Sequence, residues 1–136
     1  MMRSASSLVL VFGLAAAALA AEAKPALRDV PQIDDGLFTV GLADQIRKNC
    51  PDISARMFRA LAYLTDLKHT ARDLGYTRAE VEAHLDSDVE KDRLRARAGA
   101  YFDERGLATD AAGYCALGAQ EIKDETAVGR LLRMDN

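Results

Sequence analysis

The chain has 136 residues, a formal net charge of −3 and 49% hydrophobic residues, which predicts a single globular domain. Its 21 acidic side chains outnumber the 18 basic ones, so a nucleic acid is not expected as a partner. A small helical domain without tryptophan also offers little wall for the sugar cleft that a glycosidase needs.

Residues 1–23 have the pattern of a secretory signal peptide, with one positive charge at Arg3 and an apolar run from Leu8 to Ala21. The run has 14 residues, whereas a helix needs about 20 to span a membrane, so a permanent anchor is the weaker interpretation. Small residues fit cleavage after Ala23 or after Ala20. No lipid-attachment cysteine or Arg-Arg pair is present. We therefore expect Sec-type export to the periplasm or the medium, with no stable membrane span after cleavage.

Residues 24–136 are expected to form one α-helical domain. Pro25 and Pro31 favour extended geometry in the residues before them, which predicts an extended arm over 24–34, docked on its neighbours. A first helix is predicted over 35–49, where Phe38, Leu42 and Ile46 recur every four residues.

The clearest helical pattern covers residues 53–74, and Gly75 is placed to end it in a left-handed conformation. Its predicted core face consists of seven apolar residues: Met57, Ala60, Leu61, Leu64, Leu67, Ala71 and Leu74. Phe58 lies off this face and is predicted to meet a partner or a second core layer.

Two capping boxes follow, Thr77 with Glu80 and Ser87 with Glu90, and each predicts a helix start. The helix that begins after Thr77 is expected to run through Leu85. The helix that begins after Ser87 is expected to run to about residue 105, before Gly106. The basic KDRLRARAG stretch in the second contains acid–base pairs three residues apart, which predicts a solvated face.

A last helix is predicted after Asp110, with a stripe of Cys115, Gly118, Ala119 and Ile122 whose small members allow close helix packing. TAVGRLLRM is expected to add a final turn or two, packed back through its apolar side chains Val128, Leu131 and Leu132. Strand signals are nearly absent. The fold class is therefore all-α, a small bundle or orthogonal array of about five short helices.

Cys50 and Cys115 both remain after signal cleavage. In an exported domain an even pair of cysteines favours a disulfide, and two buried thiols are the alternative. The bridge would close a long loop and is worth about 4 kcal/mol in the chain-entropy model.

Two blocks, LRDVPQIDDGLFTVGLADQIRKNCPDISARMFRA and YCALGAQEI, resemble a family of small exported alphaproteobacterial proteins catalogued only as a domain of unknown function. The resemblance implies that the two blocks belong to one structural unit and that both cysteines are part of the family pattern. It implies no activity, cofactor or catalytic residue.

The sequence contains no recognisable catalytic, metal-binding or cofactor-binding pattern. The two cysteines are too far apart for a Cys-x-x-Cys redox motif. His69 lies four residues from Asp73, and His84 lies one turn from Glu80 and from Asp88, but a zinc site needs three or four ligands. Asp34 and Asp35 precede the first predicted helix and are expected to cap it and to interact with its dipole.

The sequence therefore favours a non-enzymatic exported envelope protein that binds another envelope protein or a peptide, with a stress chaperone as one variant. The alternative is a small metal-dependent or hydrolase-like enzyme that uses His69 or His84. The two are distinguished by whether the histidines meet several carboxylates in one pocket.

Overall fold

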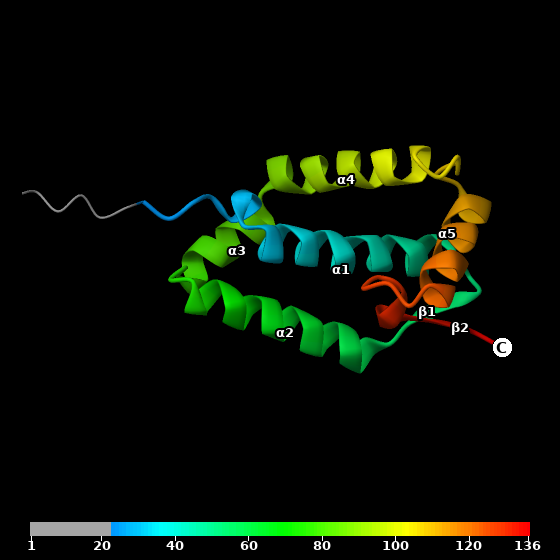
Figure 1. Ribbon diagram of the computed structural model, residues 1–136, viewed down its shortest axis with the longest axis horizontal. Coiled ribbons are helices and arrows are strands. Elements are labelled where there is room, and N and C mark those ends of the chain that lie inside the picture. Colours follow the sequence, from blue (N-terminus) through cyan, green and yellow to red (C-terminus); the bar gives the residue numbers. More distant parts are fainter. Residues whose placement is uncertain (1–22) are drawn as a thin grey trace, which may run out of the picture.

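The computed structural model describes residues 23–136, so the predicted signal peptide, except Ala23, lies outside the described residues. Three long helices lie side by side, with α1 (Pro31–Asn49) between α2 (Met57–Asp73) and α4 (Asp88–Asp103) (Figure 1). Helix α5 (Ala111–Lys123) packs across one end of α1, and the short α3 (Arg78–Asp86) joins α2 to α4 at the other end (Figure 1). The predicted all-α array of helices is confirmed.

Two three-residue strands interrupt the helical pattern. β1 (Ile53–Ala55) pairs antiparallel with β2 (Leu132–Met134), so that Ile53 lies opposite Met134. The predicted helix over 53–74 was therefore wrong in its first turn, because the chain before Met57 uses its backbone groups to pair with the C-terminal segment. The single-turn 3₁₀ helix η2 (Gly129–Leu131) precedes β2 and accounts for the final turn predicted in this region.

The N-terminal arm is shorter than predicted. A 3₁₀ turn, η1 (Leu27–Asp29), replaces part of the expected extended chain, and α1 begins at Pro31 rather than at Asp35. Proline suits the first helical position because its missing N–H would have no partner there. The arm is docked, as expected: Tyr76 donates a hydrogen bond from Oη to the Pro25 carbonyl, 2.5 Å away.

Helix ends follow the local signals closely. Thr77 and Glu80 form the complete predicted capping box at α3. Gly75 has φ +92° after α2, the left-handed conformation that favours glycine. Asp110 accepts a hydrogen bond from the Gly113 N–H at the start of α5, at 2.8 Å. The predicted start of the last helix is thus confirmed with its cap.

In the described part of the chain, the buried side chains form two clusters. The larger one lies where α5, β1, β2 and η2 meet α1, and includes Phe38, Leu42, Ile46, Cys50, Ile53, Phe102, Leu117, Val128, Leu131 and Leu132. The predicted packing of the last three is confirmed. The smaller cluster, Leu27, Ile33, Ala71 and Tyr76, joins the arm, α1 and α2.

Two glycines permit close packing on α1. A side chain at Gly118 of α5 would overlap Ile46 and Ile53, and one at Gly36 of α1 would overlap Leu67 of α2. The small-residue stripe of α5 therefore allows close helix packing at Gly118, as predicted, although Ala119 is exposed.

The predicted core face of α2 was half wrong. Ala71 is buried and Leu64 and Leu67 are partly buried, but Met57, Leu61 and Leu74 are exposed. Periodicity identifies the apolar face of a helix without showing whether a neighbour covers all of it. Within residues 23–136, no helix is both long enough and apolar enough to cross a membrane.

Candidate functional site

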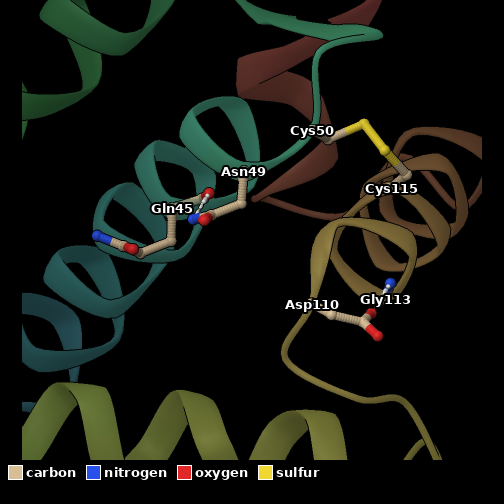
Figure 2. The surroundings of a disulfide bond; sticks show 6 residues. All are labelled: Gln45, Asn49, Cys50, Asp110, Gly113 and Cys115. Carbon is tan, nitrogen blue, oxygen red and sulfur yellow. Dashed lines mark hydrogen bonds between the residues drawn. A yellow bond between two sulfur atoms is a disulfide. The ribbon is translucent and has the colours of Figure 1, made fainter.

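The predicted disulfide joins the end of α1 to the second turn of α5 (Figure 2). Cys50 is 1% exposed, its Cα lies 5.0 Å from that of Cys115, and no described cysteine is free. The bond closes the loop that contains β1, α2, α3 and α4. A disulfide is typical of an oxidising, non-cytoplasmic compartment, and here it holds the larger cluster together.

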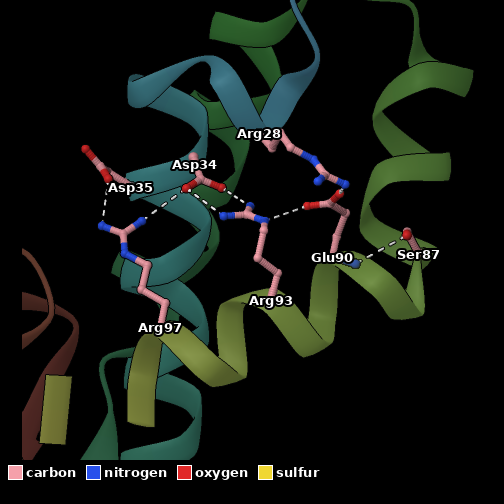
Figure 3. Close-up of polar contacts among 7 residues, drawn as sticks. All are labelled: Arg28, Asp34, Asp35, Ser87, Glu90, Arg93 and Arg97. Carbon is pink, nitrogen blue, oxygen red and sulfur yellow. Dashed lines mark hydrogen bonds and ion pairs between the residues drawn. The ribbon is translucent and has the colours of Figure 1, made fainter. Parts of the chain in front are cut away.

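An ionic cluster joins α4 to α1 and to the arm (Figure 3). Arg93 of α4 donates hydrogen bonds to both carboxylate oxygens of Asp34 and, from Nε, to Glu90 at 2.9 Å. Arg97 donates to Asp34 at 3.1 Å and to Asp35 at 2.7 Å, and Arg28 pairs with Glu90. Asp34 and Glu90 are only 8% and 6% exposed, so these carboxylates depend on their arginines for hydrogen bonds.

The cluster changes the ionisation of its members. Burial alone would raise the pKa of Glu90, but the hydrogen bond from Arg93 and the charges of Arg28 and Arg93 outweigh burial and lower it. The hydrogen bond with Asp34 raises the pKa of the Arg93 guanidinium above its ordinary value. Glu90 and Arg93 therefore both remain charged near neutral pH.

Three predictions about these residues are corrected. The basic residues of α4 do not form a wholly solvated face, because Arg93 and Arg97 reach across to α1, while Lys91 and Arg95 remain exposed beside Asp88 and Asp92. Ser87 caps α4 through the Glu90 N–H at 3.3 Å, but the Glu90 side chain binds arginines instead of completing the capping box (Figure 3). Asp34 lies in the first turn of α1 rather than at its cap.

A second buried carboxylate was not predicted from the sequence. Glu121 of α5 is 3% exposed and accepts hydrogen bonds from Tyr101 Oη, at 2.6 Å, and from Thr126. Burial, and then the Glu121 carboxylate, raise the pKa of Tyr101 to about 12. Thr126 in turn accepts from the Gly129 N–H at 3.0 Å, so the carboxylate fixes the turn after α5.

Among the described residues, a groove of about 430 Å³ lies between α1 and α4, and we call it the α1–α4 groove. Its walls are mainly apolar and aromatic and its lining contains two cations, Lys91 and Arg95, and no acid. The lining residues are Phe38, Gly41, Leu42, Gln45, Lys91, Leu94, Arg95, Ala98, Gly99, Phe102, Thr109 and Tyr114.

The start of α2 carries an exposed apolar surface, the α2 patch, which consists of Met57, Phe58 and Leu61. Their exposed fractions are 53%, 91% and 54%. Residues three and four apart on a helix are neighbours, so Leu61 lies next to both of the others. Phe58 thus faces solvent, and the predicted alternative of a second core layer is wrong.

Arginines surround the α2 patch and attach it to the C-terminal segment. The Arg56 backbone N–H donates to the Leu131 carbonyl at 2.7 Å, and its Nε donates to Leu132 at 3.0 Å. Arg59 donates to the Arg130 carbonyl at 3.4 Å. None of Arg56, Arg59 and Arg130 forms an ion pair with an acidic side chain of residues 23–136.

The two histidines lie in different surroundings. His69 is exposed on α2. His84 borders a cavity of about 20 Å³ with apolar walls, and its Nε2 is buried without a hydrogen-bond partner among the described residues. The one described group with three possible metal ligands is Cys50, Asp52 and Cys115, whose sulfurs are joined to each other. Within residues 23–136, neither histidine therefore meets several carboxylates in one pocket.

Comparison with known proteins gives a family and no function. No curated protein matches the chain significantly, and neither does any solved structure. The model of a family of unknown function, DUF5333, matches residues 25–133, which include every helix and both cysteines described above. The resemblance to a domain of unknown function is thus confirmed, and the chain belongs to the DUF5333 family.

Proposed function

We propose that this protein is a non-enzymatic envelope protein, exported by a Sec-type signal peptide to the periplasm or the medium, which binds another envelope protein or a peptide. The observation that carries the proposal is the 91% exposure of Phe58 beside Met57 and Leu61. Single exposed apolar residues are common, but a phenylalanine grouped with two further apolar side chains is typical of an interaction surface.

The charges around the α2 patch indicate the charge of the partner. Arg59, which follows Phe58 in α2, and Arg130, whose carbonyl accepts from Arg59, are exposed and form no ion pair with an acidic side chain of the described residues, in a chain whose net charge is −3. A complementary partner would insert apolar side chains against Phe58 and place carboxylates beside these arginines. The bound segment is therefore expected to be apolar at its centre and acidic at its rim.

The attachment of α2 to the C-terminal segment supports the same proposal. Because Arg56 and Arg59 hold the first turn of α2 against η2 and β2, the patch is presented on a rigid support. A preorganised surface loses less conformational entropy on binding than a mobile one. The disulfide supports the exported location, because disulfides form and persist mainly in oxidising compartments.

Site-specific photocrosslinking in the exporting cell tests this function. A photoreactive phenylalanine analogue at position 58 should give a discrete adduct with one partner, and Arg59→Glu together with Arg130→Glu should remove that adduct. Position 89 is the matched control, because Val89 is also an exposed apolar residue, at 67%, but lies on α4. Absence of an adduct at position 58, or identical adducts from both positions, would contradict the proposal.

A further inference from the structure

We propose that the α1–α4 groove is a binding site for a small organic anion with a compact apolar body, such as an aromatic carboxylate. The site is separate from the α2 patch, because its walls come from α1, α4, the following loop and α5, and from none of α2. Its volume of about 430 Å³ lies within the usual range for small-molecule sites.

The groove exists because two glycines face open space. A Cβ added at Gly41 of α1 or at Gly99 of α4 would meet no atom within 4 Å, whereas one added at Gly36 or Gly118 would overlap a neighbour. Glycine is a poor helix former, so Gly41 and Gly99 weaken their helices, and neither allows a close contact with a neighbouring element. The absence of their side chains instead leaves space between α1 and α4.

The ionic cluster joins the two helices that form the walls of this space. Near the start of α1, the two helices are joined by the long side chains of Arg93 and Arg97, which bridge to Asp34 and Asp35. The guanidinium of Arg97 also stacks on the Phe38 ring, 4.2 Å from its centre. These bridges act together with an apolar contact between the same helices, where Tyr101 of α4 packs edge to face on Phe38 with ring centres 5.6 Å apart. The groove is therefore a built feature of the fold.

The lining determines the chemistry of the ligand. The aromatic lining residues are Tyr114, which is partly exposed, and Phe38 and Phe102, which are largely buried; the Phe102 and Tyr114 rings pack edge to face with centres 4.8 Å apart. Such walls favour an aromatic or branched apolar body. Lys91 and Arg95 supply positive charge with no acid in the lining. Their neighbours Asp88 and Asp92 are 94% and 73% exposed, and such exposed pairs are weak, so an anionic ligand can replace them.

The occupant is thus expected to be a small molecule rather than a protein chain. Charge complementarity selects the anion, and the volume limits its size. Gln45 and Thr109 add polar groups to the lining, which can fix the orientation of a ligand.

A titration with three probes that share one apolar body tests the proposal: 4-phenylbutyrate, 4-phenylbutanamide and 4-phenylbutylamine. Backbone amide signals of the purified protein, with its disulfide intact, are followed by NMR. The anion should shift Gly41, Gly99 and Thr109 saturably, and should bind about three- to tenfold more tightly than the amide and more tightly still than the amine. Lys91→Gln with Arg95→Gln should remove this preference for the anion.

Gly99→Leu should fill the groove and abolish the shifts. Ala96→Leu is the matched control, because it adds a larger side chain to the exposed side of the same helix, outside the groove. Three results would overturn the proposal: no saturable shift with 4-phenylbutyrate, equal affinity for all three probes, or binding by Gly99→Leu as tight as wild type. Shifts at Gly41 and Gly99 that depend on protein concentration alone would also overturn it, since a second copy would then occupy the groove.

Discussion

Arg93 of α4 holds Asp34 of α1 through both carboxylate oxygens, although the two residues are 59 positions apart in the chain. The pair is the centre of the ionic cluster, since Arg93 also binds Glu90 and Asp34 also binds Arg97. It joins the two helices whose facing walls form the α1–α4 groove, together with the edge-to-face contact of Phe38 and Tyr101.

Replacing Arg93 by methionine is expected to destabilise the protein by about 1 to 3 kcal/mol, because it leaves Asp34 and Glu90 buried with fewer donors. Arg95→Met on the same helix is the control and should change the free energy of unfolding by less than about 0.5 kcal/mol, since its pair with Asp92 is exposed. Urea unfolding of both variants measures the difference. Equal midpoints would show that the cluster adds nothing beyond a surface ion pair.

Acid sensitivity should depend on Glu90. Its pKa in the folded protein is lowered from the ordinary 4.5, so its contribution to stability is complete above that pH and is lost as the pH falls through the lower, folded value. Glu90→Gln should therefore lose less stability than wild type between about pH 6 and about pH 3. Free energies of unfolding at the two pH values give this comparison, and parallel losses in both proteins would contradict the assigned shift.

Cys50→Ala with Cys115→Ala should lower the melting temperature by about 15 to 30 °C, corresponding to about 4 kcal/mol in the chain-entropy model. The bridge lies in a core cluster and acts on the unfolded chain, so binding at low temperature should persist. Thermal unfolding and partner binding are measured side by side. An unchanged melting temperature with lost binding would indicate a redox role instead.

Gly118→Ala should destabilise the protein by about 1 to 3 kcal/mol, because its new Cβ would overlap Ile46 and Ile53. Gly99→Ala introduces the same methyl group into open space and should stabilise α4 by up to about 1 kcal/mol. Opposite signs in denaturant midpoints are expected. If both variants were destabilised alike, α4 and α1 would be in closer contact than the groove implies.

Features encoded by neighbouring residues were predicted well from the sequence. The caps at Thr77 and Asp110 and the left-handed turn at Gly75 each depend on a few consecutive residues, and all three are present. To predict the disulfide, it was enough to infer an oxidising compartment and to count an even number of cysteines.

Features that depend on distant partners were not predicted. Glu90 has the spacing of a capping box, but Arg28 and Arg93 compete successfully for its carboxylate. Ile53–Ala55 continues a helical pattern locally, but pairs with Leu132–Met134. Apolar residues do recur with helical spacing in α2. The sequence of α2 does not show, however, that α1 covers Leu67 and leaves Leu61 exposed. The groove depends on the absence of side chains at Gly41 and Gly99, which sequence periodicity does not detect.

The affinity of the partner captured at position 58 for purified wild-type, Phe58→Ser and Val89→Ser proteins tests the central functional claim most directly. Phe58→Ser should weaken binding at least about 30-fold, the effect of losing a hot-spot side chain, and Val89→Ser should bind as wild type. Both substitutions remove one exposed apolar side chain, so a general loss of hydrophobic surface would affect them alike. Equal affinities for Phe58→Ser and wild type would contradict the account.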